Sequence, residues 1–248
     1  VVILKGGRTV VSAQAAVAHT GALAGEQRVW AAVAAEFGVI SVSSLEEMLD
    51  VSLFLSSTDL KCLPKGNGVA IVTFGGGSGV ISADQCAENG LELPRLEKAT
   101  LDRLAVIAPP VAAVKNPIDL TPQTFNSEKW FELFPEVLNA IAADPNIDIV
   151  LCQFGPMARN GTASAKAVSK LRFRTDKTVI LAWPLAPSGV YESLFQDGVY
   201  TFHEYEKAII TVSKIAKVTV SEPVIPSKLL PTLGFDWSAH MPLPTPKT

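Results

Sequence analysis

One histidine of this chain, His19, stands among very small residues, in the stretch Ala18-His19-Thr20-Gly21-Ala22-Leu23-Ala24-Gly25. We expect this stretch to form a loop in which no bulky neighbour shields the imidazole. Neutral imidazole is a good nucleophile near neutral pH. A general base or a structural role is equally open from this pattern alone. Covalent chemistry, if the chain performs any, is expected at His19.

A glycine-rich segment provides a second candidate site. The apolar run 69–74 passes into Gly75-Gly76-Gly77-Ser78-Gly79 and then into a helical pattern. Backbone N–H groups at a helix start bind phosphate or carboxylate, and Ser78 is expected to cap the helix. The segment matches neither the dinucleotide motif nor the lysine-containing phosphate loop. A tight turn without ligand is the alternative, but five small residues exceed what a turn needs, which favours an anion site.

Two further loops carry candidate substrate residues. In Asn116-Pro117-Ile118-Asp119 the proline constrains the chain, so that Asn116 and Asp119 emerge from a fixed loop. From spacing alone, a turn held by the hydrogen bonds of these side chains is the better interpretation. Gly155 lies in the segment 153–157, which follows an apolar strand. Ligands bind beyond the carboxyl ends of parallel strands, so Gly155 is expected to line the same crevice as the glycine segment.

The elements that position these residues follow an α/β pattern, because short apolar runs alternate with helical periodicity. Helices are expected near 29–37, after a capping box formed by Ser43 and Glu46, after Gly79 and over 204–216. Strands are expected at 1–4, 39–42, 69–74, 147–153, 178–183 and 199–202. We predict a partial first domain over 1–63, a linker near 62–68, a second domain over 66–218 and a proline-rich tail over 219–248.

Composition narrows the class of partners. The chain has 248 residues, a net charge of −3 and 48% hydrophobic residues, and its basic residues never form a run. This balance argues against nucleic acid as a partner. Three cysteines without a CxxC pair predict neither a zinc site nor a disulfide framework. A reduced, cytoplasmic setting and no bound metal are therefore expected. No apolar run has the length of a membrane span, so we expect no membrane partner.

Several of these segments together resemble one enzyme family. The matching segments, in chain order, are Leu4-Lys5-Gly6-Gly7-Arg8, the His19 motif, 69–79 and 116–120. They resemble the ADP-forming (NDP-forming) acyl-CoA synthetases, relatives of succinyl-CoA synthetase, from residue 1 to about residue 217. The resemblance implies two flavodoxin-like, parallel-sheet domains, the first truncated at its N-terminus.

The resemblance also implies a reaction: acid, CoA and ATP give acyl-CoA, ADP and phosphate through a phosphohistidine. His19 matches the phosphorylated histidine, and the segment from Gly75 to Gly79 would receive the phosphoryl group. CoA and ATP/ADP with Mg²⁺ are then substrates, bound mainly by a CoA-binding domain and an ATP-grasp domain not visible here. A second helix N-terminus and a glutamate that orients the histidine would also lie outside this sequence.

The implied partners are a small organic acid, CoA and the ATP-grasp domain or subunit, in a homo- or hetero-oligomer. Two other functions stay open. One is a non-catalytic regulatory module, as in some protein acetyltransferases, against which the retention of His19 argues. The other is a plain α/β domain that binds a small anion, which would leave the His19 motif unexplained.

Overall fold

The structure is a computed structural model that describes residues 1–20, 26–126, 129–157 and 160–219. Its strands form two parallel sheets, which confirms the predicted α/β class. The strands are β1 (Val2–Leu4), β2 (Ile40–Val42), β3 (Val69–Thr73), β4 (Ile118–Asp119), β5 (Ile149–Gln153), β6 (Thr178–Ala182) and β7 (Thr201–Phe202). The α-helices are α1 (Val10–Thr20), α2 (Gln27–Glu36), α3 (Leu45–Ser57), α4 (Gly76–Glu88), α5 (Lys98–Ile107), α6 (Trp130–Ala142), α7 (Gly161–Arg172), α8 (Val190–Gln196) and α9 (Tyr205–Thr219). Two short 3-10 helices cover Leu60–Cys62 and Pro122–Asn126. Within these described stretches, no helix has the length and apolar character needed to cross a bilayer.

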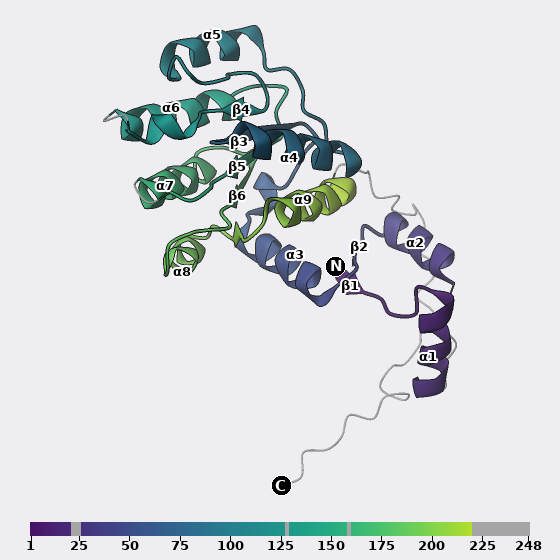
Figure 1. The fold of residues 1–248 in the computed structure, drawn as a ribbon. Helices are drawn as coiled ribbons and strands as arrows, with labels where there is room; N and C mark the ends of the chain where they lie inside the picture. Colours follow the sequence, from purple (N-terminus) through teal and green to yellow (C-terminus); the bar gives the residue numbers. More distant parts are fainter. Residues whose placement is uncertain (21–25, 127–128, 158–159, 220–248) are drawn as a thin grey trace.

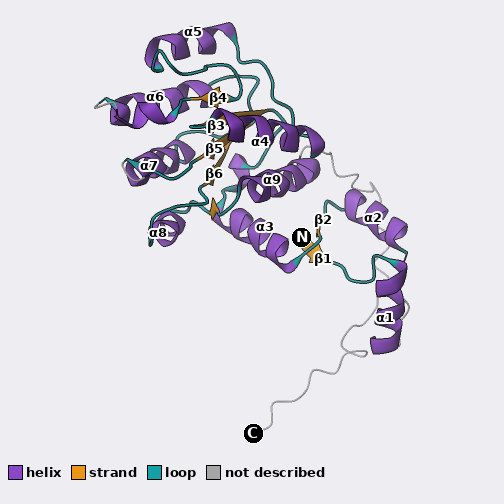
Figure 2. Ribbon diagram, viewed as in Figure 1, coloured by secondary structure: helices purple, strands orange, loops and turns teal. Residues whose placement is uncertain are grey.

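The larger sheet has the strand order β4-β3-β5-β6-β7, and every neighbouring pair is parallel. Every residue of β3, β5 and β6 is buried, because helices cover both faces of the sheet (Figures 1 and 2). The connection after β3 runs through α4 and α5 to β4, and the connection after β5 runs through α7 to β6. The chain therefore leaves the central strands β3 and β5 in opposite directions, which creates a topological switch point between them.

Helices α5 to α8 cover one face of this sheet (Figure 1). An aromatic cluster fills the space beneath them, with the rings of Phe74 and Phe154 5.6 Å apart and those of Phe154 and Trp183 5.3 Å apart. Trp130 and Phe134 stack at 4.8 Å and are almost fully buried. Burial of such side chains is the dominant stabilising contribution to a core of this kind.

Helices α3, α4 and α9 cover the opposite face, and their core continues into the small sheet β1–β2. Ile40 and Val42 of β2 belong to the same buried cluster as Ile209 and Val212 of α9. Lys214 of α9 also donates a 2.8 Å hydrogen bond to the backbone carbonyl of Ser41. One core thus spans both sheets, and the predicted division of the chain into domains at 63–66 remains a prediction.

Some local features differ in detail from what the sequence predicts. The capping pair lies one residue later than predicted: Ser44 accepts from the N–H of Glu47, whose Oε2 accepts from the N–H of Ser43 at 2.6 Å. The strand at the N-terminus is only partly buried, because β2 is its single partner in the described sheet. In the segment 62–68, where the sequence predicts a linker, the N–H of Gly68 donates to the carboxylate of Asp148 at 3.1 Å.

Candidate functional site

A cleft lies at the carboxyl ends of β3 and β5, where the switch point predicts a ligand site. It has a volume of about 370 Å³. Its lining comes from the end of β3 and the start of α4, from the end of β5 and the segment after it, from the 3-10 helix that begins at Pro122, and from α9. The lining residues are Thr73, Phe74, Gly75, Ser78, Pro122, Gln153, Gly155, Pro156, Met157 and Tyr205. Gly155 and the residues Gly75 and Ser78 of the glycine segment therefore line one cleft.

The glycine segment forms the start of α4 at this cleft. Gly75 is the N-cap, and no side chain caps the helix. The first helical hydrogen bond runs from the N–H of Gly79 to the carbonyl of Gly75 at 3.2 Å. The N–H groups of Gly76, Gly77 and Ser78 therefore have no acceptor within the helix, and they form the positive end of its dipole.

The predicted capping role of Ser78 is wrong. Its hydroxyl donates to the carbonyl of Gly75 at 2.8 Å and lies 3.0 Å from the hydroxyl of Thr73. Both partners lie at the end of β3 and in the turn, so this hydroxyl is turned back toward the strand. The consequence is that the amide groups of the first turn stay available to a ligand in the cleft.

The glycines of this segment serve different purposes. A Cβ on Gly79 would lie 3.1 Å from the methyl carbon of Thr73 and 3.3 Å from Cβ of Pro117, so close packing accounts for this glycine. A Cβ on Gly77 would meet no atom within 4 Å. Packing therefore explains Gly79 but gives no reason for Gly77, which faces open space.

The side chain of Asn116 forms hydrogen bonds with backbone groups of two other segments. Its Oδ1 accepts from the N–H of Ile71 at 3.1 Å, and its Nδ2 donates to the carbonyls of Val69 and Pro94 at 2.7 and 3.2 Å. The side chain thus continues the hydrogen bonding of the free edge of β3 beyond the short strand β4. This geometry favours the structural alternative over a substrate contact for Asn116.

Asp119 lies beside the start of α4. Its Oδ1 accepts from the N–H of Thr121 at 2.9 Å, which is the turn-stabilising hydrogen bond expected from the sequence. A Cβ on Gly76 would lie 3.2 Å from Oδ2 of Asp119, so this carboxylate neighbours the first turn. A carboxylate here interacts favourably with the helix dipole. The Asp119 carboxylate therefore occupies one side of the helix start, and an anionic ligand would have to approach the helix from the cleft.

Gln153, the last residue of β5, and Gly155, in the segment after it, face the cleft from its other side. Gly155 accepts a 2.9 Å hydrogen bond from Nε1 of Trp183 through its carbonyl, and a Cβ on it would meet no atom within 4 Å. Gln153 is 1% exposed and donates from Nε2 to the hydroxyl of Ser82 at 2.6 Å. The sequence placed the segment 153–157 at the crevice but did not single out the Gln153 amide. It gave no signal at all for Tyr205, which reaches the cleft from α9.

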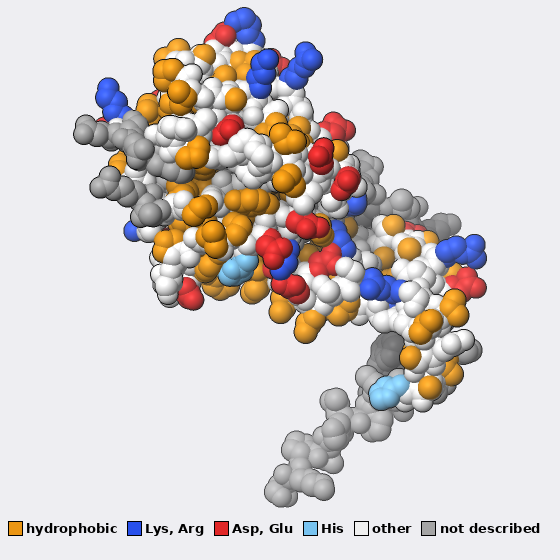
Figure 3. Space-filling model, viewed as in Figure 1, with side chains coloured by type: hydrophobic (Ala, Val, Ile, Leu, Met, Phe, Trp, Pro, Cys, Tyr) orange, Lys and Arg blue, Asp and Glu red, His pale blue; other side chains and the backbone are white. Residues whose placement is uncertain are grey.

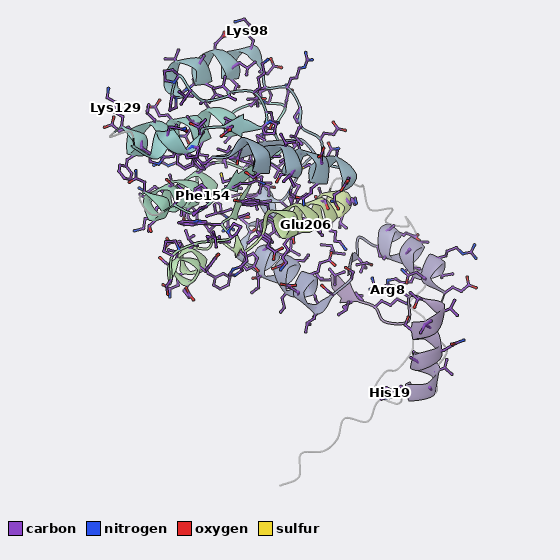
Figure 4. The ribbon with its side chains drawn as sticks, viewed as in Figure 1. Arg8, His19, Lys98, Lys129, Phe154 and Glu206 are labelled. Atoms are coloured by element: carbon purple, nitrogen blue, oxygen red, sulfur yellow. The ribbon has the colours of Figure 1, made fainter. Side chains whose placement is uncertain are left out.

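His19 lies in the last turn of α1 instead of a loop, and residues 21–25 of its motif lie outside the described residues. The alanine-rich sequence that precedes His19 has high helix propensity, which explains the difference. His19 is exposed at the outer end of α1, far from the labelled Phe154 beside the cleft (Figure 4). Figure 3 likewise shows a histidine at the tip of the projecting N-terminal part. Within one chain, the structure does not bring His19 to the glycine segment.

No group of three or more His, Cys, Asp or Glu side chains capable of holding a metal ion occurs among the residues that the structure describes. The three cysteines are buried and free. The candidate site therefore consists of backbone amides, the Gln153 amide and the hydroxyl groups of the cleft.

Comparison with known proteins gives the family. A "Succinyl-CoA ligase like flavodoxin domain" model matches residues 1–55, and a "Ligase-CoA domain" model matches residues 69–152. The alpha subunit of acetate–CoA ligase [ADP-forming] II of Pyrococcus furiosus is 36% identical over 151 residues, covering 61% of this chain and 31% of that protein. The chain belongs to the ADP-forming acyl-CoA synthetase family. A 4-hydroxybutyrate–CoA ligase [ADP-forming] of Nitrosopumilus maritimus is 26% identical over 220 residues, covering 88% of this chain and 30% of that protein.

A solved structure of this synthetase family supports the same fold. The dinucleotide-forming acetyl-coenzyme A synthetase 1 of Ca. Korarchaeum cryptofilum, in complex with phosphate and ADP, superposes with a TM-score of 0.75 at 25% identity. The match covers 88% of this chain and 48% of that chain. The chain thus spans less than a third of the length of the two curated synthetases named above and about half of this solved one.

Proposed function

We propose that this chain is the phosphoryl-carrying part of an ADP-forming acyl-CoA synthetase. The complete enzyme would convert a carboxylic acid, CoA and ATP into acyl-CoA, ADP and phosphate. The observation that carries the proposal is the uncapped start of α4 at the switch-point cleft, beside Gly75 and Ser78. Three backbone N–H groups there can neutralise a transferring phosphoryl group and stabilise the charge that builds up on it.

His19 is the proposed carrier. A ring nitrogen of His19 attacks the γ-phosphorus of ATP and ADP leaves; the carboxylate of the acid then attacks the phosphohistidine, which gives acyl phosphate and free His19. The thiol sulfur of CoA finally attacks the carbonyl carbon of the acyl phosphate, the bond from that carbon to the phosphate oxygen breaks, and the released inorganic phosphate takes up the thiol proton. Each step is reversible, so the same residues serve the direction that makes ATP.

The separation of His19 from the cleft requires a change of position or a second copy. His19 is exposed, and so are Val10 and Val11 of α1, which leaves this helix unpacked against the large sheet. We propose that α1 carries His19 between a nucleotide site and the cleft, either in the same chain or in a partner copy. The small residues after His19 would let the phosphorylated imidazole enter more than one pocket.

The remaining substrates are assigned to other parts of the enzyme. CoA and ATP/ADP with Mg²⁺ would be bound mainly by a CoA-binding domain and an ATP-grasp domain, on the same protein or on another subunit. Two of the similar proteins are named as alpha subunits, which supports an oligomer of unlike subunits. The acid would occupy the cleft near Gly155, where a small pocket selects by side-chain size.

The test is phosphoryl labelling of the complete enzyme with γ-labelled ATP. We expect an acid-labile, base-stable label on His19 that is absent from a His19→Ala variant and retained in His203→Ala, which removes another exposed histidine. Label that persists in His19→Ala would refute the assignment. A wild-type enzyme that folds, binds CoA and never takes up label would favour the non-catalytic regulatory module.

A further inference from the structure

Gln153 has an unsatisfied polar atom at the cleft. This side chain is 1% exposed, yet its Oε1 has no hydrogen-bond partner within the described part of the chain. A buried polar atom without a partner costs free energy, and such atoms are uncommon in folded proteins. Gln153 lines the same cleft as Gly75 and Ser78, so a ligand held at the start of α4 would lie close to the Gln153 side chain.

The other end of the amide is anchored to α4 itself. Nε2 of Gln153 donates to the hydroxyl of Ser82 at 2.6 Å, and Ser82 is also 1% exposed. This hydrogen bond joins the end of β5 to the second turn of α4, across the switch point. The amide plane of Gln153 is therefore fixed relative to the helix start that forms the proposed anion site.

The two orientations of a glutamine amide occupy the same space and differ only in which atom faces the serine. When Oε1 faces Ser82, the serine hydroxyl donates to it, and both hydrogens of Nε2 become available to the cleft. An anion in the cleft would select this orientation, because every polar atom then has a partner. The serine hydroxyl donates to the glutamine oxygen, and the glutamine nitrogen donates to the anion. A neutral cleft leaves one of these atoms without a partner in either orientation.

We propose that Gln153 binds the phosphoryl group at the start of α4, donating from Nε2 to a phosphoryl oxygen while its Oε1 accepts from Ser82. The inference rests on the proposed function, because that chemistry is what brings a phosphoryl group to this cleft. The group is then held from both sides of the switch point, by the backbone N–H groups of Gly76 and Gly77 on one side and by Gln153 on the other.

A binding role and a purely structural role predict opposite orders for two substitutions. Gln153→Glu keeps an acceptor for the Ser82 hydroxyl but replaces the donor with a negative charge. Gln153→Met has a similar length, removes both polar atoms and adds no charge. If Gln153 only anchors β5 to α4, the glutamate variant should resemble the wild type more than the methionine variant does.

The experiment measures the affinity of the complete enzyme for inorganic phosphate at pH 8, by calorimetric titration and by the KM for phosphate in the direction that makes ATP. We expect about a tenfold weaker affinity in Gln153→Met and roughly a hundredfold in Gln153→Glu, with the KM for ADP unchanged. Gln196→Glu, an exposed residue at the end of α8, is the matched control and should bind phosphate as the wild type does. Wild-type affinity in Gln153→Glu would overturn the proposal.

A measurement on the unaltered enzyme covers the case in which these variants fail to fold. The side-chain amide resonances of Gln153 should shift on titration with phosphate and saturate with the same dissociation constant, and resonances that do not move would overturn the proposal. Phosphate binding needs no imidazole, so His19→Ala should retain the shift. If His19 of the wild type takes up no label from ATP but the Gln153 resonances still shift with phosphate, the proposed function is refuted and the binding role of Gln153 stands.

Discussion

The hydroxyl of Tyr200 donates a 2.5 Å hydrogen bond to Oδ1 of Asp50. Tyr200 precedes β7 at one edge of the large sheet, and Asp50 lies in the middle of α3. Burial raises the pKa of Asp50, and the hydrogen bond from Tyr200 opposes this effect without cancelling it. The pair joins the N-terminal part of the chain to the large sheet through a half-buried, charged contact.

Tyr200→Phe should therefore lower the free energy of unfolding by about 1–2 kcal/mol, because a hydrogen bond to a carboxylate is lost while the ring stays packed. The pKa of Asp50 should rise further. Urea unfolding at pH 7 measures the loss. A double-mutant cycle with Asp50→Asn provides the control, since most of the effect should vanish in that background. An equal loss in both backgrounds would mean that the hydroxyl acts through another contact.

Glu47 should contribute to the acid limb of stability. Its burial alone would raise its pKa, but the hydrogen bonds from Lys214 and Ser43 outweigh burial and lower it below the usual 4.5. The folded state then holds its proton less tightly than the unfolded state does. The stabilisation is present above pH 4.5 and is lost as the pH falls through the lower, folded-state pKa. We expect Glu47→Gln to flatten the acid limb of unfolding, measured from pH 6 to about pH 3.

The matched control for this prediction is Glu36→Gln, because Glu36 is exposed at the end of α2. Its substitution should leave the acid limb as it is in the wild type. A Glu47→Gln curve that coincides with the wild type would contradict the assigned role of the Lys214–Glu47 ion pair, whose atoms lie 2.5 Å apart.

Gly161→Ala should destabilise the fold through a steric clash. A Cβ on Gly161 would lie 2.7 Å from two ring carbons of Trp183, which is fully buried and cannot move aside. Overpacking of this kind costs about 1–3 kcal/mol. Gly155→Ala places the same methyl group in open space and should change stability by less than about 0.5 kcal/mol. Thermal unfolding of the two variants checks both statements, and equal melting temperatures would contradict them.

The cysteines should be unreactive in the folded state. Burial raises the pKa of Cys86 and of Cys152 to about 12, so almost no thiolate exists at pH 8. Cys62 is also buried. We expect a disulfide reagent to label none of the three until urea unfolds the protein. Fast labelling of Cys86 or Cys152 in native buffer would show that the packing around α4 or β5 opens more readily than the structure indicates.

Periodicity predicted most of the framework. The strands β3, β5 and β6 are apolar runs with one polar residue at an end, and Gly38, with a φ of +62°, follows the end of α2, where the sequence predicts a C-terminal cap. Such signals are local, so a single sequence can reveal them. The strand pattern also predicts where a cleft would lie, because the carboxyl ends of parallel strands meet at one edge.

Contacts between distant segments have no signal in the local sequence pattern. Asn116 bonds the backbone of Val69 and Ile71 about 45 positions earlier, and no spacing rule indicates that pairing. Ser78 was expected to cap α4, but Thr73 and the carbonyl of Gly75 compete for its hydroxyl. The position of His19 depends on how α1 leaves the small sheet, which is a tertiary property without a local signal.

Helix α9 comes last among the described elements, yet it packs against α3 and β2 as well as α4, β6 and β7. During synthesis the first part of the chain therefore emerges long before the helix that completes its core. The apolar residues of this first part stay exposed until residues 205–219 have left the ribosome. A nascent chain halted before Tyr205 should accordingly be protease-sensitive at both ends, and the two sheets should become resistant together once α9 is released.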